Sequence, residues 1–328
     1  MDSTSRVLLD RIQRSFPIVP EPFRALAEGL SISEKEVRER IGVLKRNAAI
    51  RQISAIFNTG ALGYRSSLVA MSVPENDLER AVASVNAYPG VSHNYLRPGN
   101  FNMWFTIAVP PGEKLEDAVA RISANAGGWP ALILPALKKY KLAVVLDVLE
   151  DGNGDSSEEK LEIPPMESRV VFPVTAENIR IVRCIQEDLP LAVRPFAIWA
   201  GSLGMTEEEL LGIISEWTAQ GIIRRFAAVL NHRQVGFHSN GMVVWNCSEE
   251  QIDRFGGILA THSEVSHCYQ RPAYPDWPYN LYAMIHGRSV EECQVTAQKL
   301  ADAIDLGDFR ILFSTVEFKK IRLKLFWD

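Results

Sequence analysis

The sequence has no apolar run that approaches the roughly 20 residues needed to cross a lipid bilayer. Its first residues, MDSTSRVLLDRIQRSF, are charged and amphipathic, and they lack the continuous apolar segment of a signal peptide. Only four cysteines occur in 328 residues (Cys184, Cys247, Cys268 and Cys293), and none forms a CxxC pair. These absences predict a cytoplasmic protein with reduced thiols and no membrane segment.

Several common enzyme motifs are also missing. The sequence contains no GxGxxG, GxSxG or HExxH motif and no GxxxxGK followed by Ser or Thr, so nothing predicts a nucleotide, dinucleotide, serine-hydrolase or zincin site. The spacing of Asn231-His232 and His267-Cys268 matches no structural zinc pattern. The formal charge of −5 and the pI near 5.8 argue against a dedicated nucleic-acid binder.

An internal repeat runs through almost the whole chain. A shift of 173 residues aligns IRQISAIFNTGALGY, which begins at Ile50, with IRRFAAVLNHRQVGF, which begins at Ile223, and five of these 15 positions are identical. One residue of slippage later, VSHNYLRP (91–98) aligns with VSHCYQRP (265–272). We therefore expect two like units joined by the acidic linker 150–171 and packed as an intramolecular pseudo-dimer, which could assemble further into a homo-oligomer.

Each copy begins with three helical segments. Ser33 and Thr206 each precede a helical period and have a glutamate three residues later, which is the spacing of a capping box. A strand pair is expected after the third helix, so we predict winged helix-turn-helix domains over residues 1–60 and 172–234.

The second part of each copy follows the order strand, helix, strand, strand, helix, strand. This βαββαβ order is typical of a ferredoxin-like fold, which we expect over residues 61–149 and 235–328. In this prediction ALILPALKKYKLAVVLDV (131–148) and FRILFSTVEFKKIRLKLF (309–326) each form the last strand. The fold class is thus α+β, with two tandem copies of a winged helix and a ferredoxin-like domain.

The central strands of the ferredoxin-like domains have two different faces, because side chains two residues apart share a face. Leu281, Ala283 and Ile285, and their counterparts Met103, Phe105 and Ile107, form the face expected under the helices. The opposite face carries Asn280, Tyr282 and His286 in copy two and Asn102, Trp104 and Ala108 in copy one. The neighbouring strands carry the rows His267-Tyr269-Arg271 and His93-Tyr95-Arg97, with neighbours in a row about 7 Å apart.

We expect the face with these rows to be uncovered, and such a face suits a flat, carboxylate-rich aromatic ligand. An ordinary solvated sheet or a dimer interface would produce the same pattern in one domain, but its recurrence in both copies favours a site. The copies differ, because five of the six histidines belong to copy two, and Thr59 and Ala108 stand where copy two has His232 and His286. Proton-handling chemistry is therefore expected in copy two.

A helix-turn-helix also suggests DNA binding, in which the recognition helix presents Arg or Lys to the phosphates. In copy two that helix, TEEELLGIISEWTAQ, has four glutamates and no Lys or Arg. DNA binding is therefore not expected.

The layout and motifs resemble a known family. A winged helix followed by βαββαβ resembles the Lrp/AsnC transcription regulators, and IRRFAAVLNHRQVGF, VSHCYQRP and WPYNLYAMIHG are similar to siroheme decarboxylase, in a form with two related subunits fused in one chain. The resemblance implies removal of the C12 and C18 acetate carboxyl groups of siroheme, for a heme pathway or for the heme of nitrite-reducing enzymes. It implies no separate cofactor, because the iron belongs to the substrate. A transcription regulator or a non-catalytic tetrapyrrole-binding module is the alternative.

Given this resemblance, we expect His267 and His286 to supply the proton that replaces each carboxyl group. The expected substrate-binding residues are His232, Arg224, Arg225, Tyr269, Arg271, Tyr282, Asn280, His93, Arg97, Arg51 and Trp104. Arginine suits the eight carboxylates of siroheme because its guanidinium pairs with a carboxylate through two hydrogen bonds. Lys138, Lys139, Lys319 and Lys320 are more speculative sources of positive charge.

Overall fold

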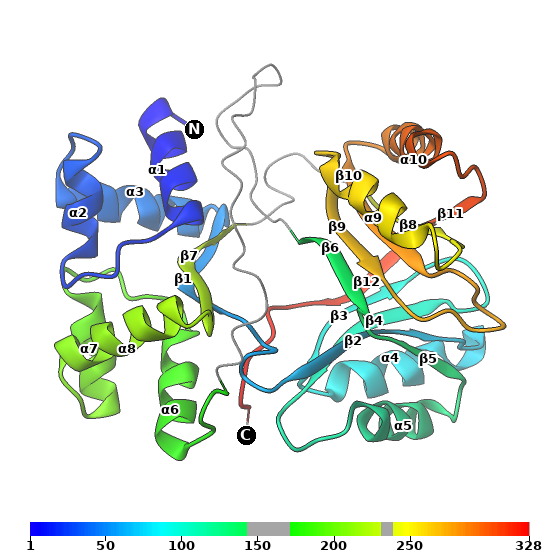
Figure 1. The fold of residues 1–328 in the computed structure, drawn as a ribbon. Coiled ribbons are helices and arrows are strands. Elements are labelled where there is room, and N and C mark those ends of the chain that lie inside the picture. Colours follow the sequence, from blue (N-terminus) through cyan, green and yellow to red (C-terminus); the bar gives the residue numbers. More distant parts are fainter. Residues whose placement is uncertain (143–170, 231–238, 328) are drawn as a thin grey trace. The chain divides into compact units, whose positions relative to one another are not determined.

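The computed structural model of the chain describes residues 1–142, 171–230 and 239–327. These residues divide into two compact units (Figure 1): the first contains residues 1–64, 171–230 and 325–327, and the second contains residues 65–142 and 239–324. Both units take residues from both copies of the repeat, so like domains pack with each other. The linker expected at 150–171, apart from Val171, lies outside the described residues, as do His232 and His238. No described helix is long and apolar enough to cross a membrane.

The first unit contains three helices and one strand from each copy. Copy one supplies α1 (Ser3–Arg14), α2 (Pro22–Glu28), α3 (Glu34–Arg46) and β1 (Ile50–Phe57), and copy two supplies α6 (Ala176–Ile185), α7 (Pro195–Leu203), α8 (Glu207–Ala219) and β7 (Ile223–Leu230). The strand pair expected within each copy is wrong for the described residues. Each copy contributes one strand, and β1 pairs with β7 in an antiparallel ribbon.

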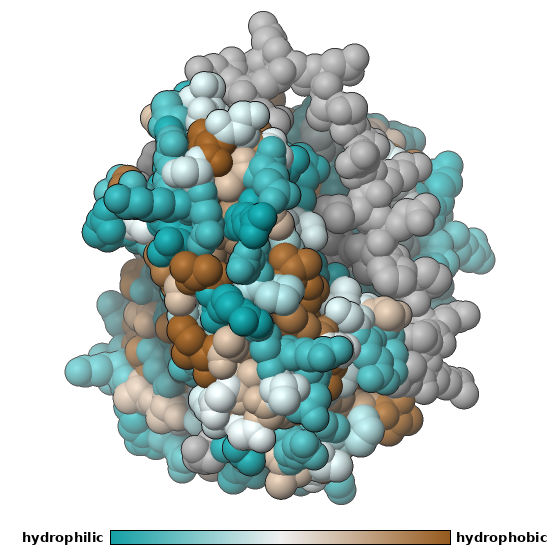
Figure 2. Space-filling model, turned by 90° about the vertical axis from the view of Figure 1, so that its left-hand side faces the viewer, coloured by the Kyte–Doolittle hydropathy of each residue, from teal (hydrophilic) through white to brown (hydrophobic). Residues whose placement is uncertain are grey.

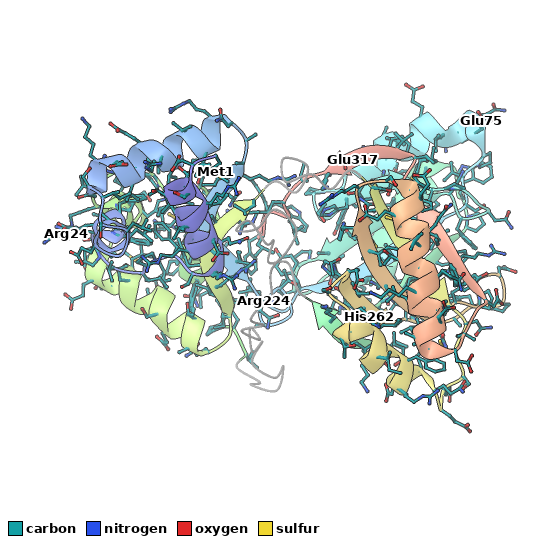
Figure 3. All side chains as sticks on the ribbon, turned by 90° about the horizontal axis from the view of Figure 1, so that it is seen from above. Met1, Arg24, Glu75, Arg224, His262 and Glu317 are labelled. Atoms are coloured by element: carbon teal, nitrogen blue, oxygen red, sulfur yellow. The ribbon has the colours of Figure 1, made fainter. Side chains whose placement is uncertain are left out.

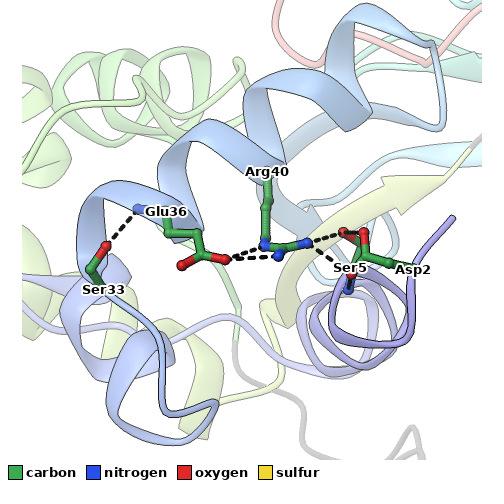
Figure 4. Close-up of polar contacts among 5 residues, drawn as sticks. All are labelled: Asp2, Ser5, Ser33, Glu36 and Arg40. Carbon is green, nitrogen blue, oxygen red and sulfur yellow. Dashed lines mark hydrogen bonds and ion pairs between the residues drawn. The ribbon is translucent and has the colours of Figure 1, made fainter.

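The predicted capping boxes differ between the copies. At α8, Thr206 and Glu209 form both hydrogen bonds of the box. At α3, the Ser33 hydroxyl accepts from the Glu36 amide, but the Glu36 carboxylate accepts from Arg40 (Figure 4). Arg40 also donates to Asp2 and Ser5, so in copy one the glutamate and arginine connect α3 to the start of α1.

Aromatic side chains join the winged helices of the two copies. Phe16 of copy one lies between Phe23, at 5.7 Å between ring centroids, and Phe226 of copy two, at 6.0 Å. The Phe226 ring in turn lies 5.6 Å from that of Phe196. All four side chains are buried, so a single apolar core spans both copies.

The second unit contains two five-stranded sheets and four long helices. Copy one supplies β2 (Arg65–Met71), α4 (Leu78–Ala87), β3 (Val91–Leu96), β4 (Met103–Val109), α5 (Leu115–Ala126), β5 (Ala131–Leu134) and β6 (Lys138–Leu142). Copy two supplies β8 (Ser239–Trp245), α9 (Ile252–Thr261), β9 (Val265–Gln270), β10 (Leu281–Gly287), α10 (Val290–Ile304), β11 (Phe309–Phe313) and β12 (Val316–Lys320). The βαββαβ order is therefore present in both copies.

The last strand of each copy is divided in two, which the sequence prediction missed. β5 pairs with β2 of its own copy, but β6 pairs with β9 of copy two; likewise β11 pairs with β8, and β12 pairs with β3 of copy one. Figure 1 shows β6 beside β9 and β12 beside β3. The two copies thus exchange their last strands, and each sheet contains strands of both.

Three apolar cores hold the second unit together. One contains Met103, Phe105 and Ile107 under α4 and α5, and its equivalent contains Leu281, Ala283 and Ile285 under α9 and α10, as predicted. The third core lies between the sheets and includes Trp104 and Leu134 of copy one with Trp277, Tyr282 and Leu312 of copy two. The two sheets therefore pack face to face.

The exchanged strands are attached to helices of the other copy. The ammonium group of Lys141 on β6 donates to the carbonyl of His262, which ends α9, and that of Lys319 on β12 donates to the carbonyls of Asn86 and Tyr88 at the end of α4. Lysine at a helix C-terminus is favourable because the last carbonyls lack partners. The Tyr140 hydroxyl also donates to Asp253 of α9 over 2.6 Å.

Packing of Tyr140 against α9 leads to a stability prediction. A Cβ atom at Gly256 would collide with the Tyr140 ring, whereas a Cβ atom at Gly257 meets no atom within 4 Å. We expect Gly256→Ala to lower the free energy of unfolding of the full chain by about 1–3 kcal/mol. The control Gly257→Ala should raise it by about 0.5–1 kcal/mol, because alanine favours the helix. Urea unfolding measures both, and equal values would contradict the proposed packing.

Candidate active site

The His-Tyr-Arg rows are arranged along single strand faces, as the sequence predicts. In β9 the ring centroids of His267 and Tyr269 are 6.1 Å apart, and the guanidinium carbon of Arg271 lies 4.8 Å from the Tyr269 centroid. In β3 the centroids of His93 and Tyr95 are 6.2 Å apart. Each row therefore runs from a histidine to an arginine on one side of its sheet.

The arginine ends of the rows lie in the inter-sheet packing. Arg97 donates a hydrogen bond to the carbonyl of Leu312 in the opposite sheet, and Arg271 donates in the equivalent way to the carbonyl of Leu134. Burial lowers the pKa of Arg97 to about 10 and also lowers that of Arg271. These arginines connect the two sheets, which is a structural task that the sequence prediction had not assigned to them.

The aromatic side chains expected to face the ligand are covered. Trp104 is 1% exposed and Tyr282 is 2% exposed, and both belong to the inter-sheet core. The expectation of an uncovered face is therefore wrong at these positions, because the sheet of the other copy covers it. Trp104 donates to the carbonyl of Phe101, and the Tyr282 hydroxyl bonds Trp277 and the carbonyl of Tyr279.

Asn280 has both of its amide groups bonded to the backbone. Its oxygen accepts from the Cys247 amide over 2.9 Å, and its nitrogen donates to the Cys247 carbonyl over 2.8 Å. Asn102 makes the equivalent pair of bonds with Val73. The same pair of hydrogen bonds occurs in both copies, which indicates that these asparagines join neighbouring backbone segments. We therefore leave Asn280 out of the candidate site.

The histidine ends of the rows are half-buried, and in copy two they bring three polar side chains together. The Ser266 hydroxyl oxygen lies 2.9 Å from Nδ1 of His267 and 2.9 Å from Nε2 of His286, and it donates to the Met284 carbonyl over 3.2 Å. We call Ser266, His267 and His286 the histidine cluster. Ser266 thus bridges two of the residues expected at the site, His267 and His286.

A β-bulge explains how neighbouring residues of β9 point to the same place. Met284 pairs with His267, but Ile285 pairs with Val265, which leaves Ser266 as an extra residue in β9. Side chains normally alternate along a strand, and a bulge re-aims one of them. The Ser266 side chain therefore lies beside His267 instead of on the opposite face.

Copy one has the same bulge with different partners. Ser92 is the extra residue of β3, and its hydroxyl lies 2.9 Å from Nδ1 of His93 and 2.9 Å from the Thr106 hydroxyl. The counterpart of His286 is Ala108, so this cluster has one imidazole instead of two. The difference between the copies that the sequence indicates is therefore present in the geometry.

The surroundings of His286 favour its neutral form. Burial lowers its pKa, and the positive charge of Lys320 lowers it further. Lys320 belongs to β12, which lies in the opposite sheet because of the strand exchange. A protonated imidazole with a lowered pKa is a stronger acid, which suits proton donation.

The other positively charged side chains that were expected to bind substrate carboxylates lie partly in the first unit and partly in the second. Lys138 forms an ion pair with Asp253 over 2.7 Å, and Lys139 lies opposite Tyr269 in the ladder. Arg51 and Arg224 are exposed on the ribbon of the first unit, where the Arg224 guanidinium lies 3.5 Å from the Asn58 side-chain oxygen (Figure 3). Arg225 is half-buried, and burial lowers its pKa. His232 lies outside the described residues.

Sequence reasoning missed Ser266 and Ser92. The available signal was the Val-Ser-His triplet that both copies retain. Simple alternation placed the serine on the opposite face from the histidine, and only the bulge reverses that assignment. Among the described residues, no three His, Cys, Asp or Glu side chains are grouped so that they could hold a metal ion.

Comparison with protein families gives two matches, each of which occurs twice. The AsnC-like ligand binding domain matches residues 61–141 and 234–319. The siroheme decarboxylase NirDL-like HTH domain matches residues 5–51 and 178–224. The matches alternate along the chain, as the internal repeat requires.

Similar proteins cover nearly the full length. A siroheme decarboxylase of Hydrogenobacter thermophilus is 39% identical over 320 residues, which is 97% of this chain and 94% of the relative. The crystal structure of the siroheme decarboxylase NirDL matches with a TM-score of 0.79 at 35% identity and covers 99% of this chain and 95% of its own. A second crystal structure of NirDL, in complex with an iron-uroporphyrin III analogue, matches with a TM-score of 0.78 at 35% identity. This match covers 98% of this chain and 94% of the NirDL chain.

The position of Lys320 gives a prediction for His286. Lys320→Met should raise the pKa of His286, measured by NMR titration, because a repelling charge is removed. Lys319→Met is the matched control, since the Lys319 ammonium group bonds the carbonyls that end α4. An unchanged His286 pKa in Lys320→Met would contradict the assignment.

The lowered pKa of His286 also fixes the sign of a pH effect on stability. The unfolded chain binds more protons at this residue, so its contribution to stability is present above about pH 6.5 and is lost as the pH falls through the folded-state pKa. His286→Asn should reduce that acid loss, which urea unfolding at a series of pH values measures. An acid loss as large as that of the wild type would show that His286 does not cause it.

Proposed function

Because this chain belongs to the siroheme decarboxylase family and is therefore a carboxy-lyase, we propose that it removes the carboxyl groups from the C12 and C18 acetate side chains of siroheme. The product would be 12,18-didecarboxysiroheme, and the reaction needs no cofactor besides the iron tetrapyrrole itself. The observation that carries the proposal for this chain is the histidine cluster, at the half-buried end of the inter-sheet face.

Each decarboxylation consumes one proton. The bond between the acetate methylene carbon and the carboxylate breaks, CO2 leaves, and the electron pair stays with the methylene carbon and its pyrrole ring. A proton then forms the new C–H bond, which turns the acetate into a methyl group. We assign this proton to the histidine cluster, with His267 as the donor and His286 as its partner, because imidazole transfers protons near neutral pH.

Binding of the substrate requires cations and flat surfaces. Tyr269 and His93 stay in the proposed site because both are half-buried: His93 is the histidine end of its row, and Tyr269 lies beside His267. Arg51, Arg224 and Arg225 of the first unit, together with His232, stay predictions from the sequence, since arginine binds carboxylates in a bidentate manner. The complex of NirDL with an iron-uroporphyrin III analogue supports a tetrapyrrole ligand for this family.

The regulator alternative receives little support from the winged helices. Basic residues of α3 are engaged with glutamates of the same helix: Arg38 with Glu34 over 3.3 Å and Arg40 with Glu36 over 2.7 Å. The helix α8 has no basic residue. Figure 2 shows a face of the first unit on which hydrophilic and hydrophobic residues are mixed. We therefore propose that these helices serve the fold and not DNA binding.

The function is tested by incubating the purified protein with siroheme in the absence of oxygen and following the products by mass spectrometry. Loss of two CO2 molecules is the expected result. A shift of the siroheme absorption spectrum without a change of mass would identify a non-catalytic binding module. No loss of mass, together with tight binding to duplex DNA, would favour the regulator.

The roles of the histidines are tested by substitution. His267→Ala and His286→Ala should each lower kcat by about 10²–10⁴-fold, the usual contribution of a general acid. His262→Ala is the control, because His262 ends α9 (Figure 3) and Lys141 bonds its backbone carbonyl, which alanine keeps. Wild-type rates in both cluster variants would refute the assignment.

A further inference from the structure

The Ser266 hydroxyl lies within hydrogen-bond distance of both histidines of the cluster. It lies 2.9 Å from Nδ1 of His267 and 2.9 Å from Nε2 of His286, and both distances are those of ordinary hydrogen bonds. Its third neighbour is the Met284 carbonyl, at 3.2 Å. Three partners thus surround a group that has a single hydrogen.

The count of hydrogens restricts what these contacts can be. A serine hydroxyl donates one hydrogen bond and accepts two. When it donates to Met284, both imidazole nitrogens must donate to it, so each carries a proton on the serine side. When it turns to donate to His267 Nδ1, it can still accept from His286 Nε2. The hydroxyl therefore connects the two imidazoles in a chain along which a proton can pass.

We propose that Ser266 relays a proton from His286 to His267 and so reloads the proton donor during the reaction. This inference rests on the proposed function, in which two decarboxylations consume two protons. It assigns Ser266 as a positioning residue, because its hydroxyl acts through His267 and does not act on the substrate.

The relay step balances. Protonated His286 gives its Nε2 proton to the Ser266 oxygen, and the Ser266 hydrogen passes to Nδ1 of His267. The proton on Nε2 of His267 goes to the methylene carbon, whose electron pair comes from the bond broken on release of CO2. His286 ends neutral, His267 changes tautomer, and the serine regains its hydrogen. The carboxylate charge and the imidazolium charge disappear together.

Two further observations accompany this geometry. Burial and the charge of Lys320 lower the pKa of His286, which makes its protonated form a stronger acid. Copy one has the serine, the bulge and the histidine, but Thr106 and Ala108 leave its serine without a second imidazole. The second imidazole is therefore an addition specific to copy two.

The test measures the rates of the two decarboxylation steps in Ser266→Ala, with enzyme in excess over siroheme. Each release of CO2 draws one proton from His286 through Ser266, so we expect both steps to slow by about 10²-fold. Ser266→Thr keeps the hydroxyl and should restore both steps. Ser92→Ala, the matched change in copy one, should slow both steps much less.

Two results would overturn the relay. One is a wild-type rate of both steps in Ser266→Ala, and the other is a slowing that Ser266→Thr does not repair, which would mean a structural role. A readout without substrate separates the relay from the proposed function. In ¹⁵N NMR spectra the signals of His267 Nδ1 and His286 Nε2 should both move in Ser266→Ala and stay in place in Ser92→Ala. If wild-type protein releases no CO2, the proposed function fails, and unmoved nitrogen signals would reject the relay.

Discussion

The exchange of the last strands is the constraint on which the second unit depends. β6 completes the sheet of copy two and β12 completes that of copy one, so neither sheet is whole with residues of a single copy. Antiparallel pairing satisfies backbone groups that β9 and β3 would otherwise leave at an edge. The aromatic core between the sheets adds buried apolar area. The two copies consequently form a fused pseudo-dimer with shared sheets and not two tethered domains.

Face-to-face packing gives one repeated motif two different tasks. At the arginine end of each row, Arg97 or Arg271 is buried and bonds a carbonyl of the opposite sheet. At the histidine end the side chains are half-buried, and in copy two they meet around Ser266. The sequence pattern suited either a dimer interface or a binding site. In the structure the arginine end of each row belongs to the interface between the sheets, and in copy two the histidine end carries the histidine cluster.

The asymmetry of the copies follows from few substitutions on a common backbone. Both copies have the bulge that turns the serine toward its histidine, so this backbone geometry does not depend on His286. Copy two has His286 where copy one has Ala108, and this histidine is the second imidazole of the cluster. The exchange of the last strands places Lys320 where its charge lowers the pKa of His286. In the proposed mechanism copy two carries the proton chemistry, whereas both copies complete each other's sheets.

The amino-acid sequence is enough to predict the repeat, the βαββαβ order, the apolar faces under the helices and the histidine excess of copy two. These features follow from residue identity and periodicity, which act over neighbouring residues. The division between β5 and β6 could not be predicted, because a strand such as Lys138–Leu142 has the same local preference in either sheet. Nor does the sequence show that Trp104 and Tyr282 are covered or that Ser266 joins two histidines. Burial and hydrogen bonding of these side chains depend on strands distant in sequence, and on a bulge whose register no local pattern shows.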